Sequence, residues 1–206
     1  MKKLLVFLFL VSNALALHAA EYVEGKHYQK IGNAQIVNSG DKVLVQEFFW
    51  YGCPHCYSFE PFVKSWKKTK SANVEFARVP AIFRPEWEIQ ARTYYALESM
   101  GMIEEVHGKI FDAMHKQKKR LNTKKLITDF VVAQGVDEAK FNKEYNSFSV
   151  DTLARKAKKY QALYKIQGVP SVIVNGKYLT SGSMSGNYDN LIKIIDYLVK
   201  LELDKK

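Results

Sequence analysis

Val43–Phe49 is an almost unbroken apolar stretch in which Gln46 and Glu47 are the polar exceptions. A run of this length with so little polar relief is typical of a β-strand that is covered on both faces. Trp50-Tyr51-Gly52 predicts a turn after the strand. Apolar residues then recur at helical spacing, which predicts a helix that begins at Pro54 and buries Phe59, Phe62, Val63 and Trp66.

The rest of the chain alternates strand and helix patterns around a long helical stretch. A second strand is expected at 74–79, and the periodicity from 86 to 148 is helical, with breaks at 99–102, 122–123 and 134–137. There follow a long helix at about 149–165, a strand at 172–174, an Asn175-Gly176 hairpin turn, a return strand from Lys177 and a last helix at 188–203. The pattern predicts an α/β fold that contains a helical insertion.

The first residues have the layout of a secretory signal peptide. A basic start, Lys2-Lys3, precedes the apolar run Leu4–Val11, and small residues gather from 14 to 20. A membrane anchor is the alternative, but the apolar part is short, whereas a spanning helix needs about 20 apolar residues. We therefore expect residues 1–19 to be a leader that is cleaved between 16 and 20, and the mature protein to be exported without stable membrane insertion.

Positive charge is concentrated in two runs, residues 64–70 and 116–125. The formal net charge is +10, or +8 without Lys2 and Lys3. Such runs are one sign of nucleic-acid binding. An exported protein meets little nucleic acid, however, and most lysine clusters are solvated surface. We therefore expect no nucleic-acid partner.

The chain contains two cysteines, and both lie in one motif, Cys53-Pro54-His55-Cys56. A structural disulfide usually joins distant segments, because its stabilisation grows with the length of the loop that it closes. A structural zinc site needs four ligands, and His27, His107 and His115 show no ligand spacing relative to the cysteines, so no metal is expected. In an oxidising compartment, this motif between a strand and a helix indicates a disulfide that forms and breaks in exchange reactions.

The two sulfurs of the motif are expected to differ. Cys53 lies at the helix start, where free N–H groups and the helix dipole favour a thiolate. Cys56 lies one turn further in and is expected to be more buried. His55 can donate a hydrogen bond or positive charge to the Cys53 sulfur, and Pro54 and His55 together are expected to tune its redox behaviour. Cys53 is therefore the predicted nucleophile and Cys56 the resolving cysteine.

Glu47 is costly in a buried strand unless it has a partner or keeps its proton. It could pair with a buried lysine, or reach solvent at the end of the strand. It could also accept a proton from the Cys56 thiol, directly or through a water molecule, since carboxyl groups with shifted pKa values gather at active sites.

Three blocks of sequence resemble the DsbA family of bacterial periplasmic thiol:disulfide oxidoreductases, in the thioredoxin-like superfamily. They are Glu47-Phe48-Phe49, the segment from Cys53 to Glu60, and Gly168-Val169-Pro170 with the hairpin that follows it. The resemblance covers most of the chain and is weakest between 80 and 150. It implies a thioredoxin-like domain, residues 20–82 and 149–206, interrupted by an inserted all-helical domain, residues 83–148.

The resemblance also implies roles for particular residues. Cys53 is the exposed nucleophile, and Val169-Pro170 is a cis-proline loop beside it that contacts the substrate. Glu47 and Glu60 occupy the acidic positions of a candidate proton relay. No cofactor is expected, and the expected partner is a membrane quinone-linked reoxidase of the DsbB type.

The predicted function is to oxidise cysteine pairs of unfolded exported proteins in the periplasm. An isomerase or reductase that is kept reduced is the main alternative, and a chaperone that only holds peptides in a groove is the third. The side chains of Trp50, Tyr51 and Phe83 are equally candidates for a substrate groove and for the core.

Overall fold

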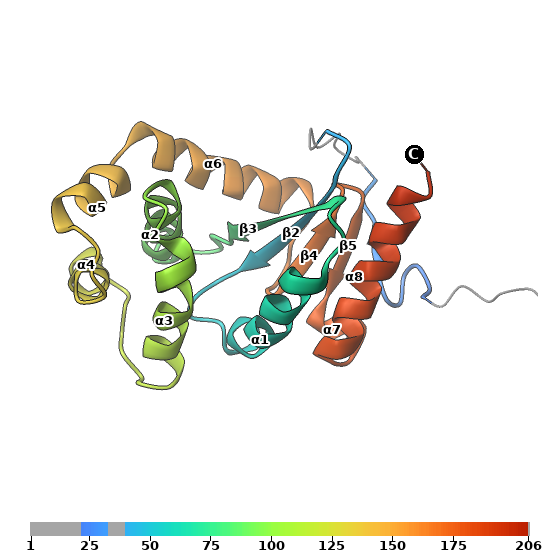
Figure 1. Cartoon of the computed structure of the whole chain (residues 1–206), viewed down its shortest axis with the longest axis horizontal. Coiled ribbons are helices and arrows are strands. Elements are labelled where there is room, and N and C mark those ends of the chain that lie inside the picture. Colours follow the sequence, from blue (N-terminus) through green and yellow to red (C-terminus); the bar gives the residue numbers. More distant parts are fainter. Residues whose placement is uncertain (1–21, 33–39, 206) are drawn as a thin grey trace, which may run out of the picture.

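The computed structural model describes residues 22–32 and 40–205, and the expected leader lies outside them. Within these residues one sheet contains β1 (Gln29–Lys30), β2 (Val43–Phe49), β3 (Val74–Pro80), β4 (Ser171–Val174) and β5 (Tyr178–Ser181). The helices are α1 (Pro54–Thr69), α2 (Trp87–Ser99), α3 (Ile103–His115), α4 (Lys124–Val132), α5 (Glu138–Tyr145), α6 (Phe148–Leu163), α7 (Gly182–Ser185) and α8 (Tyr188–Leu203). Figure 1 shows these elements in the colour order of the sequence.

The strands lie in the order β1-β5-β4-β2-β3 across the sheet. β2 pairs with β3 in parallel and with β4 in antiparallel orientation, and the other neighbours are antiparallel. Because β2 has a strand on each side and helices on each face, all 7 of its residues are buried. The expectation of a doubly covered central strand is confirmed.

Helices cover both faces of the sheet (Figure 1). α1 and α8 lie on one face, where Val45, Phe59 and Leu198 belong to one apolar cluster. α6 lies on the other face, and Tyr164 at its end meets the ring of Phe48 edge-on, with the ring centres 6.0 Å apart. The active-site helix α1 therefore packs beside α8 on the face of the sheet opposite α6.

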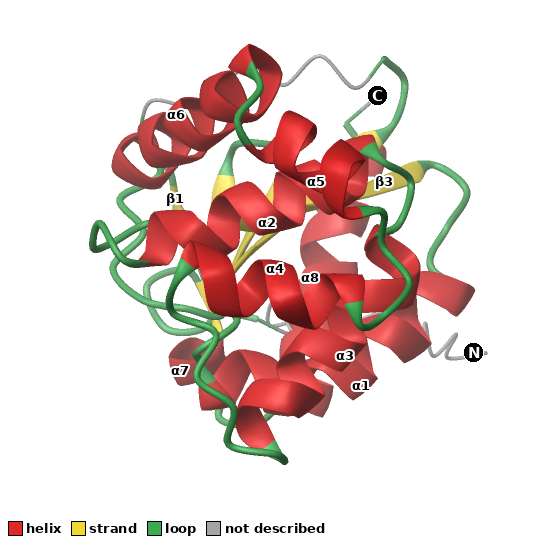
Figure 2. Ribbon diagram, turned by 90° about the vertical axis from the view of Figure 1, so that its left-hand side faces the viewer, coloured by secondary structure: helices red, strands yellow, loops and turns green. Residues whose placement is uncertain are grey.

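The helices α2 to α5 lie beyond the end of β2 (Figures 1 and 2). The starts of α4 and α5 follow from capping, since Thr123 and Asp137 accept hydrogen bonds from the first-turn N–H groups of these helices. Ser147 caps α6 in the same way. The end of the sheet and these helices share one apolar cluster, which includes Phe49, Tyr51, Phe111, Ile127 and Phe141.

Several boundaries differ from those that the sequence predicts. α6 covers 148–163 and not 149–165, because Lys165 has a φ of 53° that is incompatible with an α-helix. Asn175 and Gly176 have φ values of 51° and 66°, and Val174 pairs with Tyr178, so Lys177 belongs to the turn and not to the return strand. β3 extends to Pro80, and α5, which follows the predicted break at 134–137, ends at Tyr145 and not at 148. The two-residue β1 and the four-residue α7 are too short to show a period.

None of the helices in the described part of the chain combines the length and the apolar character that crossing a membrane requires.

Candidate active site

The Cys53-Pro54-His55-Cys56 motif lies where β2 leads into α1. The turn is closed by a hydrogen bond from the Cys53 N–H to the Trp50 carbonyl at 3.0 Å. Cys53 is the N-cap residue of α1, and its Sγ accepts a hydrogen bond from the Cys56 N–H at 3.2 Å. Pro54 takes the first helical position, where a missing N–H costs no helical hydrogen bond. The predicted strand, turn and helix start are confirmed.

Both cysteines are free thiols in this structure, and they differ in burial. Cys56 is fully buried, and Cys53 is 6% exposed. The order is as expected, but the description of Cys53 as exposed was wrong, because the helix start and the loop at Val169 cover most of its surface. A reacting thiol therefore meets only a small part of the Cys53 sulfur.

The surroundings separate the pKa values of the two thiols. A hydrogen bond from the Cys56 thiol, the backbone N–H groups of Cys56 and His55 and the charge of His55 together lower the pKa of Cys53 to about 6. Burial raises the pKa of Cys56 well above its usual range, and the neighbouring Cys53 sulfur and Glu47 raise it further. At pH 7 the site thus holds mainly a thiolate at Cys53 and a neutral thiol at Cys56.

The loop before β4 lies against the Cys53 sulfur. The Val169–Pro170 peptide bond is cis, and the Val169 carbonyl oxygen lies 3.4 Å from Cys53 Sγ. Ser171 Oγ donates a hydrogen bond of 2.7 Å to the Gly168 carbonyl and closes the loop. The expected cis bond beside the nucleophile is confirmed.

A groove of about 1020 Å³ opens next to this loop. Its lining includes Val169 and Pro170 on one side and His55, Phe62 and Tyr188 on the other. The Tyr188 hydroxyl donates a hydrogen bond of 3.0 Å to the His55 carbonyl, which joins the first turns of α1 and α8. The groove therefore ends at the motif that holds the two cysteines.

Trp50, Tyr51 and Phe83, the aromatic candidates from the sequence, do not line this groove. Tyr51 belongs to the core and is 1% exposed. The Trp50 indole stacks on Trp87 with ring centres 3.8 Å apart, and a Cβ at Gly52 would lie 2.3 Å from that indole, so position 52 requires glycine. Phe83 packs edge-on against Trp87 at 5.4 Å.

A buried ion-pair network lies near Cys56 and joins α1 to the sheet. Arg78 of β3 is the register partner of Glu47 and donates from Nε to Glu47 Oε2 at 3.0 Å. The same guanidinium donates from Nη2 to both Glu60 oxygens, at 2.9 and 3.1 Å. Glu47 therefore neither pairs with a lysine nor reaches solvent, because an arginine from the neighbouring strand meets it inside the protein.

The two carboxyl groups of this network have opposite pKa shifts. Burial raises the pKa of Glu47 to about 7, although Arg78 opposes the shift. Burial acts on Glu60 as well, but hydrogen bonds and charge from His107 and Arg78 outweigh it, and the pKa of Glu60 is lowered. Glu60 is thus ionised at pH 7, while Glu47 exchanges its proton near neutral pH.

His107 of α3 extends the network into the helical segment. Its Nδ1 lies 2.8 Å from the Tyr51 hydroxyl, and its Nε2 lies 3.2 Å from Glu60 Oε1. Burial lowers the pKa of His107, so the ring is neutral at pH 7. It then accepts the Tyr51 O–H at Nδ1 and donates its Nε2–H to Glu60. Sequence reasoning considered His107 only as a metal ligand and did not consider Arg78, although an arginine inside a predicted strand was a signal of a partner for Glu47.

Comparisons with known proteins identify the family. The DSBA-like thioredoxin domain profile matches residues 73–193. The thiol:disulfide interchange protein DsbA of Burkholderia cepacia is 42% identical over 212 residues, covering 100% of both chains, and that of Pseudomonas aeruginosa is 40% identical over 188 residues, covering 91% of this chain and 89% of the relative. The chain belongs to the DsbA-like thioredoxin family.

Solved DsbA structures share the whole fold. The crystal structure of Pseudomonas aeruginosa DsbA has a TM-score of 0.86 at 40% identity, covering 91% of this chain and 99% of that one. NmDsbA1 of Neisseria meningitidis has a TM-score of 0.78 at 27% identity, covering 89% of this chain and 94% of that one. The thioredoxin-like fold is confirmed, and as a DsbA-like enzyme the protein is a thiol:disulfide oxidoreductase.

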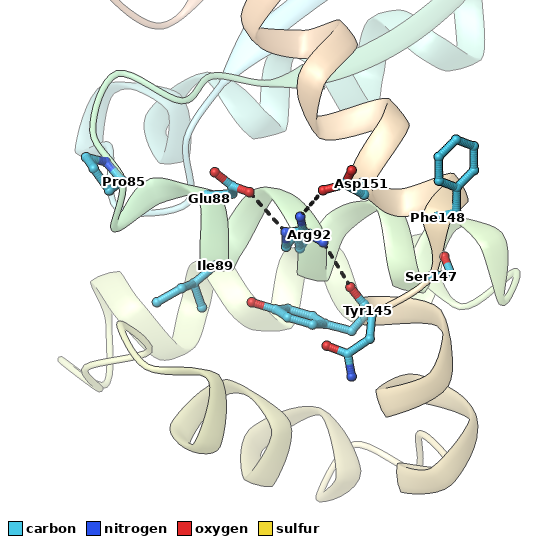
Figure 3. A pocket seen from close by; sticks show the side chains of 9 residues that line it. Pro85, Glu88, Ile89, Arg92, Tyr145, Ser147, Phe148 and Asp151 are labelled. Atoms are coloured by element: carbon cyan, nitrogen blue, oxygen red, sulfur yellow. Dashed lines mark hydrogen bonds and ion pairs between the residues drawn. The ribbon is translucent and has the colours of Figure 1, made fainter.

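Another pocket of this DsbA-like chain, of about 690 Å³, lies on the helical segment away from the cysteines (Figure 3). Arg92 of α2 occupies it and donates hydrogen bonds to Glu88, to Asp151 of α6 and to the Tyr145 carbonyl. Because two carboxylates neutralise Arg92, this pocket is a junction between helices and not a charged binding site. Among the described residues, no group of three or more His, Cys, Asp and Glu side chains is placed to hold a metal ion.

Proposed function

We propose that this protein introduces disulfide bonds into exported proteins in the periplasm through Cys53 and Cys56. The observation that carries the proposal is the opposite displacement of the two thiol pKa values, lowered to about 6 at Cys53 and raised at Cys56. A thiolate that the folded protein stabilises also stabilises the reduced enzyme. The oxidised enzyme therefore transfers its disulfide readily.

The exchange proceeds in two steps, each of which forms and breaks one S–S bond. A client thiolate attacks Cys53 Sγ of the enzyme disulfide, forms a mixed disulfide with Cys53 and releases Cys56 as a thiolate. The second client thiolate then attacks the client sulfur of the mixed disulfide and releases Cys53 as a thiolate. Two electrons pass from the client to the enzyme, and the client gains one disulfide.

Glu47 is the proposed carrier of the Cys56 proton. The buried Cys56 thiolate needs a proton when it leaves, and the Cys56 thiol must lose one when the enzyme is reoxidised. A carboxyl group with a pKa of about 7 can do both near neutral pH. Glu60, which stays ionised, is better suited to holding Arg78 against Glu47 than to carrying a proton itself.

The groove is the proposed binding site for the client, in extended conformation along the Val169-Pro170 loop. The low exposure of Cys53 favours clients whose cysteines lie in flexible, unfolded chain, because a folded surface does not fit a small opening. We further propose that a membrane quinone-linked enzyme of the DsbB type reoxidises the protein. The proposed domains remain residues 20–82 with 149–206, and 83–148.

The test uses a reduced, unfolded protein with several cysteine pairs as the client and follows its free thiols. Oxidised wild-type enzyme is expected to remove client thiols in stoichiometric amount, and Cys53→Ser is expected to remove none. Trapping of the redox state of Cys53 and Cys56 in living cells then shows whether the enzyme oxidises its clients or reduces them. A mostly reduced enzyme would favour the isomerase or reductase, and unchanged client refolding by Cys53→Ser would favour a chaperone.

A further inference from the structure

The basic run at residues 116–125 is a second charged feature that the exchange chemistry does not use. Between Asp112 and Asp129 the chain has six lysines and arginines and no other carboxylate. Asp112 pairs with Lys116 at 3.1 Å and Asp129 with Lys125 at 2.6 Å. The remaining four cations, at 118, 119, 120 and 124, have no carboxylate partner among the described residues. We call residues 116–125 the basic segment.

The fold places the basic segment beside the active site. It follows the last residue of α3, His115, whose Nε2 lies 2.8 Å from the Tyr51 carbonyl and whose ring stacks on Tyr57 at 4.8 Å. The Tyr57 N–H in turn donates a hydrogen bond of 3.1 Å to the Cys53 carbonyl. The Lys119 N–H bonds back to the Ala113 carbonyl at 2.9 Å and keeps the segment close to the end of α3.

The fold compensates only part of the charge of the basic segment. Lys124 and Lys125 occupy the first turn of α4, where the helix dipole is unfavourable to cations. Lys118, Lys119 and Arg120 are consecutive exposed cations that repel each other. Lys118 also has a φ of 56°, which a residue with a side chain adopts rarely. The charge that the fold leaves uncompensated is available to attract an anionic partner.

Cys53 lies between two different surfaces. The groove on the Val169 side carries Lys165 and Asp189 in its lining, which balance each other. The basic segment lies on the Tyr57 side and is strongly positive. The groove and the basic segment both lie close to the Cys53 sulfur and differ in charge.

We propose that the basic segment selects clients that carry acidic residues next to the reacting cysteine. This inference rests on the proposed function, because it names the substrate class of that same site. The reacting client group is a thiolate, so a positive field at Cys53 raises the local concentration of the anionic reactant. Neighbouring Asp and Glu residues add to this attraction. An anionic membrane is the weaker alternative, because the reacting thiolate and its flanking charges belong to the same chain at the moment of exchange.

The test measures the second-order rate at which oxidised enzyme reacts with three unstructured dithiol peptides. They are identical except for three flanking residues, which are Asp, Ser or Lys. For wild type at low salt we expect the acidic peptide to react on the order of tenfold faster than the neutral one, and the basic peptide more slowly. The preference is expected to disappear at ~1 M salt, where the Debye length is about 3 Å.

A triple charge reversal, Lys118→Glu with Lys119→Glu and Arg120→Glu, is expected to abolish the preference. It is expected to slow the neutral peptide less than the acidic one, because only the reacting thiolate of the neutral peptide is charged. The matched control reverses three exposed cations elsewhere, Lys156→Glu and Lys159→Glu on α6 and Lys200→Glu on α8. The control has the same net charge, so it separates local from global electrostatics.

Equal rates for all three peptides in wild type, or an equal loss of preference in the control, would overturn the inference. Failure of even the neutral peptide to react would instead contradict the proposed function. Vesicles with anionic lipids complete the test. If the triple variant loses vesicle binding but keeps its peptide preference, the segment binds membranes and the inference is wrong.

Discussion

Several interactions stabilise the negative charge on the sulfur atom of Cys53. The Cys56 thiol contributes most, followed by backbone N–H groups at the helix start and the charge of His55. Burial keeps Cys56 neutral, and the hydrogen bond that lowers the pKa of Cys53 raises the pKa of Cys56. Cys53 and Cys56 are only three residues apart at the start of α1, yet Cys53 is a thiolate nucleophile and Cys56 is a neutral thiol that needs a base before it can react.

Replacing Cys56 by alanine is expected to raise the pKa of Cys53 more than replacing His55 by alanine does. The Cys56 thiol is the largest stabilising hydrogen bond, and its loss is expected to raise the pKa by more than ~1 unit, roughly 1.4 kcal/mol. Alkylation rate against pH for the reduced wild type and each variant gives the three values. A wild-type midpoint at the ordinary cysteine value of about 8.5 would remove the basis of the proposed function.

Glu47→Gln is expected to flatten the pH dependence of stability. In the wild type the unfolded carboxyl loses its proton near 4.5 and the folded one near 7, so the unfolding free energy falls as pH rises between these values. The variant lacks this loss of unfolding free energy, which is about 3 kcal/mol for a shift of about 2.5 pKa units. Urea unfolding at pH 4, 5.5 and 7.5 measures it. Parallel curves for wild type and variant would show that the pKa of Glu47 is not raised.

At the scale of single elements, α3 is tied to the active site through side chains that face the interior. His107 bonds to Tyr51, two residues before Cys53, and to Glu60 on α1. His115, about two turns further along α3, bonds through its Nε2 to the carbonyl oxygen of Tyr51. The helical segment therefore fixes the turn that presents Cys53, in addition to packing against it.

The bond between Tyr51 and His107 can be measured with a double-mutant cycle. His107→Leu leaves the Tyr51 hydroxyl without its buried partner and removes one of the hydrogen bonds to Glu60, which keeps Arg78, and is expected to cost about 2–3 kcal/mol of unfolding free energy. In a Tyr51→Phe background the same change is expected to cost about 1 kcal/mol less, since one of the two bonds is already absent. Denaturant unfolding of the four proteins gives the coupling. A coupling of zero would mean that the two rings are neighbours without a stabilising bond.

The sequence predicts the elements better than it predicts the network that joins them. β2, the start of α1 and the whole of α8 follow from local periodicity and from Pro54, and the structure agrees with them. Arg78 and His107 could not be placed, because their partners lie far away in sequence, and pairing across a sheet or between helices depends on register. The cysteine motif needed no such information, since both sulfurs lie in one helical turn.

At the scale of the whole molecule, reduction is expected to stabilise the protein. The thiolate at Cys53 is favoured in the folded state, with a pKa of about 6 against about 8.5 for an ordinary cysteine, and the disulfide has no such group. A lowered pKa adds stability above the folded value, and this gain is lost as pH falls through 6. Allowing for solvent screening, we expect on the order of 1 kcal/mol at pH 7, or about 2–4 °C.

Thermal unfolding with and without reductant at pH 7 and again at pH 4 measures this difference. The reduced form is expected to melt higher at pH 7, and its advantage is expected to vanish at pH 4. The disulfide closes a very short loop, so its own contribution through the unfolded chain is small. An oxidised form that melts higher at both pH values would favour the reductase.

The strand order also affects how much of the sheet can form while the chain is still being synthesised. Synthesis proceeds from the N-terminus, yet β4 and β5, which come late in the sequence, lie between β1 and β2. Until Ser171–Ser181 arrive, the sheet has a gap two strands wide, and no Val169 carbonyl lies beside Cys53. During most of its synthesis the nascent chain therefore resembles an unfolded client. Its two thiols are exposed and can react with the disulfide of another protein.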